Sequence, residues 1–208
     1  LVYVETNMTS NKLIINKTEI PSDRRFLAKI FSAGNEQFQV QLQDNIESPP
    51  TVYSQPEKLI AISDIEGNFY ALTKVLIGND IINSNFQWTF GNGHLVLVGD
   101  LFDRGYNVTA CLWLLYELET QAKKQGGMVH MIMGNHEEMI LNKDHRYVND
   151  KYITTAKKLD LDYEQLYAEN TVIGSWLRTK PVIIQINELL FVHAGISPEF
   201  VEKGFTAE

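Results

Sequence analysis

Residues 94–105 read HLVLVGDLFDRG, an apolar run of strand length that ends directly in charged side chains. The run is short and rich in valine and leucine, which is typical of a strand buried on both faces of a parallel sheet. Asp100, Asp103 and Arg104 stand just beyond its carboxyl end. Ligands of open α/β sheets bind outside the carboxyl ends of the strands, so this stretch predicts both a fold class and the place of a site.

Three further apolar runs are followed directly by residues that bind metals or transfer protons. They are LIAIS (59–63), followed by Asp64 and Glu66; MVHMIM (128–133), followed by Asn135, His136 and Glu137; and LLFV (189–192), followed by His193. Alone, SDIEGN (63–68) is explained by a polar turn. If the strand continues through it, however, Asp64 and Glu66 project to the same side. Four such strand ends together favour one convergent metal site over four separate turns.

The rest of the chain divides into two regions. Residues 1–46 contain the strand-like runs VYVET, KLIINKTEI, RRFLAKIFS and FQVQLQ, and SAGNE (32–36) has hairpin-turn chemistry, so we expect a small antiparallel β unit. Residues 47–57 hold three prolines among polar residues and predict a linker. Residues 58–208 alternate apolar strands with amphipathic segments, which predicts an α/β domain.

Several segments of this domain are expected to be helical. The run at 107–127 has a plausible N-cap at Asn107 and a stop at Gly126, and residues 138–150 and 151–177 also have helical patterns. Residues 181–194 contain two apolar runs separated by NE and predict a hairpin.

Composition excludes several classes of protein. A formal net charge of −8 argues against general nucleic-acid binding, which depends on cationic side chains that neutralise phosphates. The single cysteine, Cys111, cannot form an internal disulfide and is expected to be a buried helix thiol. No apolar run approaches the roughly 18–20 residues that a membrane span needs. The chain starts at Leu1, so a targeting segment cannot be read, and the cytoplasm and the periplasm both stay open.

The strand-end motifs resemble those of the calcineurin-like metallophosphoesterases, in their phosphoprotein phosphatase branch. GDLFDRG (99–105) and GNHE (134–137) match that pattern, and the longer strings FGNGHLVLVGDLFDRG, GGMVHMIMGNHEEM and RYV are similar to the Shewanella-like bacterial phosphatases. The resemblance covers residues 58–208. It implies an α/β sandwich of mixed β-sheets flanked by helices, preceded by the small antiparallel β unit. It also implies that the C-terminal part of the fold, with a further ligand histidine and a phosphate-binding arginine, lies beyond Glu208.

The resemblance implies two divalent metal ions. Asp64, Glu66 and Asp100 would hold the first, and Asp100, Asn135 and His193 the second. Glu66 departs from the family pattern, which has histidine there, so the first site becomes an all-oxygen site that favours Mn or Mg. The second site keeps an imidazole and accepts Mn, Fe or Zn.

The remaining motif residues are expected to act on the substrate, a phosphorylated protein or a small phosphomonoester. A metal-bridging hydroxide attacks phosphorus directly, and Arg104 offers the phosphate a planar, bidentate donor. Asn135 and Arg146 are further phosphate contacts. His136 protonates the leaving oxygen, and Asp103 orients its imidazole.

Two other functions stay open. Symmetrical diadenosine tetraphosphatases share the string HAGI (193–196), which makes hydrolysis of dinucleoside polyphosphates a rival activity. A catalytically dead scaffold is the other rival, motivated by Glu66 and by the ligand expected beyond Glu208. Retention of both metal-type and acid-type residues opposes this second rival.

Overall fold

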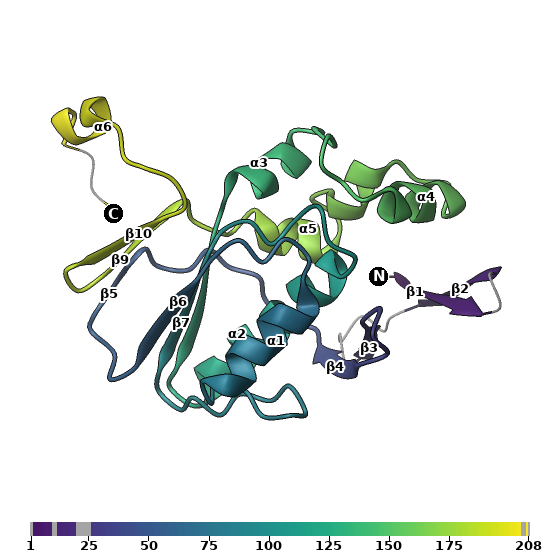
Figure 1. The fold of residues 1–208 in the computed structure, drawn as a ribbon, viewed down its shortest axis with the longest axis horizontal. Helices are drawn as coiled ribbons and strands as arrows, with labels where there is room; N and C mark the ends of the chain where they lie inside the picture. Colours follow the sequence, from purple (N-terminus) through teal and green to yellow (C-terminus); the bar gives the residue numbers. More distant parts are fainter. Residues whose placement is uncertain (1, 10–11, 20–25, 205–206, 208) are drawn as a thin grey trace.

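The computed structural model describes residues 2–9, 12–19, 26–204 and 207. Two three-stranded sheets face each other, and helices cover the outer face of one of them (Figure 1). The predicted α/β sandwich is therefore confirmed. Ile20 of the expected strand KLIINKTEI, and Arg24 and Arg25 of RRFLAKIFS, lie outside the described residues. The strands are β1 (Val2–Thr9), β2 (Lys12–Glu19), β3 (Leu27–Phe31), β4 (Gln37–Gln41), β5 (Val52–Tyr53), β6 (Leu59–Ile62), β7 (His94–Val98), β8 (Met128–Ile132), β9 (Ile183–Ile186) and β10 (Leu189–Val192).

The first sheet is parallel and has the order β6-β7-β8. Its central strand β7 is buried over nearly its whole length, as expected for a strand covered on both faces. Helices α1 (Phe69–Gly78) and α2 (Val108–Lys124) cover one face, and α2 contributes a long row of buried side chains to the large core. Because the three strands are parallel, their carboxyl ends and the loops that follow share one edge of the sheet.

The second sheet is mixed and packs against the other face of the first. β9 pairs antiparallel with β10 and parallel with β5, in the order β10-β9-β5. Ile184 and Ile186 of β9 form a small second core with Val96 and Ile132 of the parallel sheet. The hairpin expected at 181–194 is present, and Asn187 in its turn has a φ of 51°. β5 falls inside the predicted linker, where prolines are tolerated because it is an edge strand.

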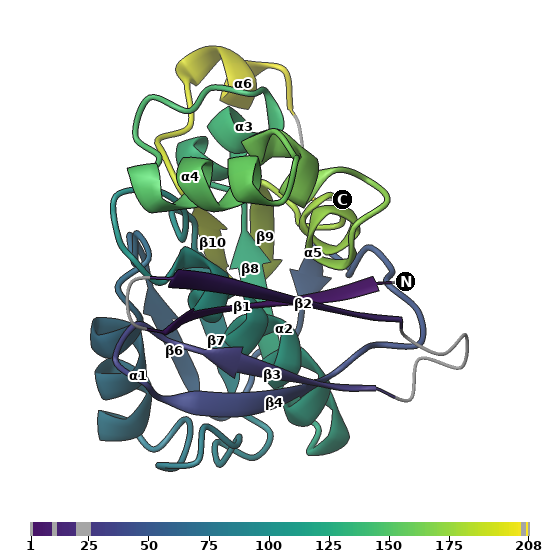
Figure 2. The same cartoon turned by 90° about the vertical axis from the view of Figure 1, so that its right-hand side faces the viewer.

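The expected N-terminal strands form two separate hairpins, β1-β2 and β3-β4. Figure 2 shows β3 and β4 lying across α2, and the backbone N–H of Gln41 donates to Glu117 of that helix at 2.8 Å. Phe38 of β4 stacks on Phe69 of α1, with ring centroids 5.9 Å apart. The β3-β4 hairpin thus shares the main core, and the division into residues 1–46, 47–57 and 58–208 stays a prediction.

Three stretches expected to be helical are not, namely residues 142–149, 159–162 and 168–171. Residues 142–149 form turns between two helices, with Lys143 at a φ of 64°. The Asn149 side chain accepts from the backbone N–H of Lys151 and begins the next helix, so the helical pattern is interrupted before it. No helix in the described part of the chain is long and apolar enough to cross a bilayer. The helices after β8 are α3 (Asn135–Leu141), α4 (Asp150–Lys158), the 3₁₀ helix η1 (Tyr163–Tyr167), α5 (Val172–Leu177) and α6 (Pro198–Glu202).

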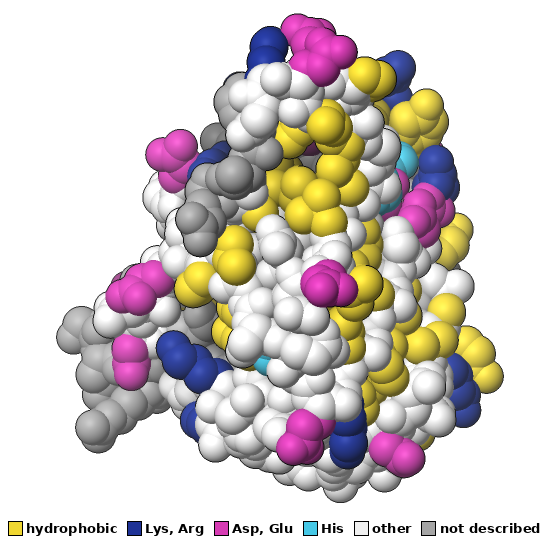
Figure 3. Space-filling model, turned by 90° about the vertical axis from the view of Figure 1, so that its left-hand side faces the viewer, with side chains coloured by type: hydrophobic (Ala, Val, Ile, Leu, Met, Phe, Trp, Pro, Cys, Tyr) yellow, Lys and Arg dark blue, Asp and Glu magenta, His cyan; other side chains and the backbone are white. Residues whose placement is uncertain are grey.

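The outer face of the second sheet is apolar and exposed. Figure 3 shows hydrophobic side chains spread over this side of the molecule. In and beside the strands of this sheet, Val52, Val182, Leu189 and Leu190 are each between 38% and 64% exposed. β10 is also an edge strand of the described sheet. Edge strands with apolar faces can pair with additional polypeptide, which would cover their apolar side chains.

Candidate metal centre and acid site

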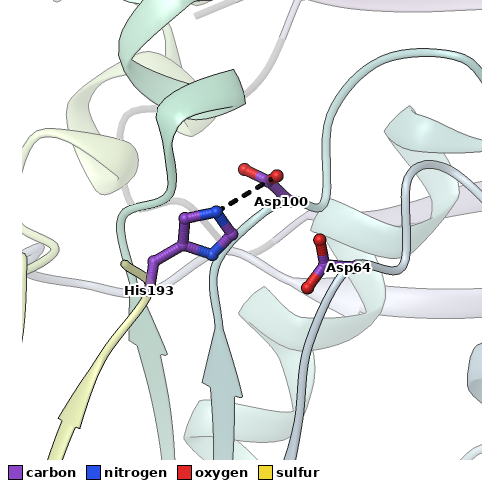
Figure 4. Close-up of side chains that lie close together, drawn as sticks. All are labelled: Asp64, Asp100 and His193. Atoms are coloured by element: carbon purple, nitrogen blue, oxygen red, sulfur yellow. Dashed lines mark ion pairs between the residues drawn. The ribbon is translucent and has the colours of Figure 1, made fainter. Parts of the chain in front are cut away.

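The loops after β6, β7, β8 and β10 bring the predicted site residues to one edge. Asp64, Asp100 and His193 have ligand atoms that all lie within 4.8 Å of one another, and Figure 4 shows the three side chains turned toward a common space. Glu66, Asp100 and His136 form a second group of the same kind. Asp100 belongs to both groups and is only 4% exposed. The predicted convergence of four strand ends is present in the structure.

The loop after β6 does not continue the strand. The prediction that Asp64 and Glu66 project to the same side of a continued strand is therefore wrong. β6 ends at Ile62, and both acidic residues have left-handed backbones, with φ of 55° and 47°. Their backbone N–H groups instead donate to the carbonyls of Gly99 and Asp100, at 3.2 and 2.9 Å. Asp64 and Glu66 therefore lie in different groups, and their binding of one shared ion stays a prediction.

Left-handed backbone is concentrated around the site. Besides Asp64 and Glu66, the loop after β7 holds Asp100, Asp103 and Arg104 at φ between 52° and 71°. Such a conformation costs a non-glycine residue roughly 1–2 kcal/mol and persists where the surroundings enforce it. The side chains of these loops are thus aimed by backbone geometry that the neighbouring loop holds in place.

Two glycines permit the close approach of these loops. A Cβ on Gly99 would lie 2.7 Å from both the Cα of Gly134 and the Nδ1 of His193. A Cβ on Gly134 would lie 2.3 Å from Oδ1 of Asp100. The glycines of the GD and GNHE motifs therefore make room for the side chains that follow them.

The surroundings of His193 fit a divalent metal ion. Its Nδ1 lies 2.7 Å from the carbonyl oxygen of Val98, which only accepts, so Nδ1 carries a proton. In the neutral imidazole Nε2 is then an acceptor, yet it faces Asp100 Oδ2 at 3.2 Å and Asn135 Oδ1 at 3.0 Å. Acceptors turned toward one another repel unless a proton or a metal ion lies among them. With Asp64 added, the donors are two carboxylates, an amide oxygen and an imidazole nitrogen, a set that suits Mg, Mn, Fe or Zn.

His136 and Asp103 form a buried pair beside the metal-type group. Nδ1 of His136 lies 2.5 Å from Oδ2 of Asp103, and the two residues are 3% and 2% exposed. Burial raises the pKa of the Asp103 carboxyl, and the hydrogen bond with His136 opposes that rise. Nε2 of His136 faces Asp100 Oδ2 at 3.9 Å. The imidazole is thus oriented by one carboxylate and presents its other nitrogen to the metal-type group.

The two arginines are already engaged by carboxylates. Arg104 forms an ion pair with Glu66, and its side chain is half exposed. Arg146 is held by Asp144, with Nε 2.9 Å from both carboxylate oxygens and Nη2 2.7 Å from Oδ2. A phosphate would have to displace Asp144 to use this face of Arg146. Arg104 lies at the site beside Glu66. The expected contact of Arg146 with a phosphate stays a prediction.

Comparison with known proteins identifies the family. The model of the calcineurin-like phosphoesterases matches residues 57–206. The chain belongs to that family. A solved cold-active protein-tyrosine phosphatase of a Shewanella species is similar over 99% of this chain and 64% of its own, with a TM-score of 0.85 and 36% identity. Shewanella-like protein phosphatase 1 of Plasmodium berghei is 34% identical over 67% of this chain and 39% of its own length. Shewanella-like protein phosphatase 2 of Arabidopsis thaliana is 32% identical over 62% of this chain and 31% of its own length.

These matches confirm the predicted family. The chain spans less than two thirds of the length of each of these three proteins. The similarity therefore covers only part of each of these proteins, and the activity, substrates and partners of the whole protein are treated as proposals.

Glu137 stands among the strand-end residues of the sequence, but its part in the site was not predicted. Its carboxylate is 1% exposed and accepts backbone N–H groups from Asp100 at 2.8 Å, Leu101 at 2.7 Å and Gly134 at 2.8 Å. Burial raises the pKa of this carboxyl, and the three hydrogen bonds oppose the rise. Glu137 therefore braces the loop after β7 against α3 by accepting hydrogen bonds from backbone amides. The signal for this role is its place three residues after Gly134, the N3 position of a helix.

Replacement of Glu137 by alanine is expected to destabilise the fold by at least about 3 kcal/mol, because buried N–H donors lose their acceptor. Chemical denaturation of the intact protein measures the loss. Glu138→Ala on the same helix is the matched control, since Glu138 is exposed and should change stability by no more than about 0.5 kcal/mol. Equal losses in the two variants would contradict the bracing role.

Proposed function

We propose that this chain is the catalytic region of a metal-dependent phosphomonoester hydrolase, acting as a protein phosphatase on phosphotyrosine and/or phosphoserine/threonine. The observation that carries the proposal is the meeting of a metal-type group, Asp64, Asp100 and His193, with the buried pair His136 and Asp103 at one sheet edge. A binding module has no need of a cation and an oriented acid at the same place, whereas hydrolysis of a phosphoester uses both.

Divalent cations bound there would supply positive charge and an acidified water to the reaction. We assign Asp64, Asp100, Asn135 and His193 to holding them, with Mn or Mg as the first candidates at the carboxylate-rich end. The phosphate would be placed by Arg104 once it leaves Glu66, since a guanidinium binds two phosphate oxygens in plane.

His136 acts as the general acid in this proposal. Asp103 binds its Nδ1–H, which fixes the tautomer so that Nε2 faces the reacting group. A proton delivered from Nε2 neutralises the departing oxygen of the ester. The pair is nearly closed to solvent, so its orientation is maintained between turnovers.

A panel of three substrates tests this assignment on the intact, Mn-loaded protein. We expect hydrolysis of a phosphotyrosine peptide, a phosphoserine peptide, or both, at rates far above that of diadenosine tetraphosphate. Preference for diadenosine tetraphosphate would move the assignment to dinucleoside polyphosphate hydrolysis. Metal binding with no turnover of any of the three substrates would support the alternative of a catalytically dead scaffold.

We further propose that additional polypeptide of the intact protein packs on β10 and on the exposed apolar face beside it, and completes the metal site. The partial coverage of the solved Shewanella phosphatase supports this, as does the exposure of Leu189 and Leu190. Phosphatase activity should accordingly be measured on the longest natural chain.

Glu66 has two possible roles, which metal titration separates. If its carboxylate binds metal, Glu66→Ala should raise the metal concentration for half-maximal activity about 10–100-fold, and Glu66→His should raise it less because imidazole is also a ligand. If Glu66 serves only as the partner of Arg104, both variants should change KM for the phosphoester and leave the metal dependence unchanged.

A further inference from the structure

Tyr147 lies at the rim of the site, although its loop carries none of the residues assigned to holding the metal ions. It stands in the turn segment between α3 and α4 and is 46% exposed. Its ring centroid is 5.3 Å from that of His136, and its carbonyl accepts the backbone N–H of Arg104 at 3.0 Å. The loop of Tyr147 is thereby tied to the DRG turn, and the ring stands beside the proposed acid.

Two cationic side chains contact the ring of Tyr147. The guanidinium carbons of Arg104 and Arg146 lie 5.6 and 5.8 Å from its centroid, within cation–π range. Arg146 is itself held by Asp144. A half-exposed aromatic ring that is fixed in this way costs little further entropy when it binds a ligand.

The type of leaving group determines which substrate atoms would lie beside the Tyr147 ring. If His136 protonates the ester oxygen, that oxygen lies about 2.6–3.2 Å from Nε2 in the reacting complex. In an aryl phosphate the phenyl ring is bonded directly to that oxygen, so it enters the space beside His136, where an aromatic ring could pack against it at the usual spacing of aromatic pairs, about 4.5–7 Å. An alkyl phosphate places only a methylene group there.

We propose that Tyr147 determines specificity for aryl phosphates, its ring packing against the phenyl group of a phosphotyrosine side chain while His136 protonates the phenolic oxygen. This inference rests on the proposed phosphatase function and names the substrate class of the same site. It predicts that the contact acts on aryl esters alone, because the phosphate group common to all substrates is held elsewhere.

The test compares two peptides of identical sequence, one with phosphotyrosine and one with phosphoserine, on the intact Mn-loaded protein. Tyr147→Leu should lower the ratio of kcat/KM for phosphotyrosine over phosphoserine about three- to tenfold, mainly through KM. Tyr147→Phe keeps the ring and should stay within about twofold of wild type. Tyr106→Leu is the matched control, since Tyr106 is 62% exposed on a neighbouring loop and its ring contacts Lys151.

Two results would overturn the inference. An equal loss on both peptides would mean that Tyr147 acts through Arg104 on phosphate binding, and an unchanged ratio would mean that its ring contacts no substrate. Wild type that hydrolyses neither peptide overturns the proposed function instead. In that case calorimetric titration with phenylphosphonate and methylphosphonate decides the inference, because Tyr147→Leu should weaken only the phenyl compound.

Discussion

Asp100→Asn is expected to lower kcat/KM of the intact protein at least about 10³-fold. Asp100 is shared by the group of Asp64 and His193 and by the group of Glu66 and His136. Asparagine removes its negative charge from both groups at once. The variant should therefore lose metal affinity as well as turnover.

The same substitution should leave the fold intact, which makes the loss interpretable. Oδ1 of Asp100 accepts the backbone N–H of His136 at 3.1 Å, and the asparagine carbonyl oxygen can accept it in the same way. Asp150→Asn is the matched control, because Asp150 is exposed in the first turn of α4. Thermal unfolding and metal titration should accompany the kinetics. Retention of more than about one tenth of the activity would show that Asp100 does not hold the catalytic charge.

His136→Asn is expected to lower kcat about 10²–10⁴-fold on phenyl phosphate and on alkyl phosphates, the usual worth of a general acid. On p-nitrophenyl phosphate the loss should be much smaller, because nitrophenolate departs with little need of a proton. The measurement is kcat for wild type and variant across a series of aryl phosphates of rising leaving-group pKa. A general acid produces a loss that grows along the series.

Asp103→Asn is the companion variant in this series. Its side chain binds Nδ1 of His136 and touches no reacting group, so it should give the same trend with a smaller loss. A loss from His136→Asn that is uniform across all leaving groups would remove His136 from the role of acid and leave it a positioning residue.

The place of the site was predictable because short-range patterns imply the topology that creates it. Apolar runs that alternate with helical segments predict a parallel sheet, and the carboxyl ends of parallel strands share an edge. Asp100 and His136 follow neighbouring strands, so their proximity follows from the pattern alone. The hairpin that carries His193 was predictable from its NE turn, although not the contact of His193 with Val98 of the other sheet.

The orientation of side chains at the site was not predictable from the same patterns. The positive φ of Asp64 and Glu66 depends on hydrogen bonds to carbonyls of the loop after β7, which no local pattern records. The ion pair of Glu66 with Arg104 depends in turn on that geometry. Contacts between loops distant in sequence decide these details, whereas propensity and periodicity describe only neighbours along the chain.

Two errors of secondary structure have the same physical origin. Residues 142–149 belong to the run 138–150 that was expected to be helical, but Asn149 caps the helix that follows and interrupts the pattern. β5 lies between prolines that disfavour strands, yet it pairs with β9, which lies far along the chain. In both cases a specific hydrogen-bond partner overrides the average preference of the sequence.

Anomalous X-ray scattering from crystals of the intact protein grown with Mn²⁺ tests the central claim most directly, because it locates the cation without reference to activity. The account predicts a peak within coordinating distance of the carboxylate of Asp100 and of Nε2 of His193, and its disappearance in Asp100→Asn. An active protein whose Mn²⁺ lies away from Asp100, or whose peak persists unchanged in Asp100→Asn, would contradict it.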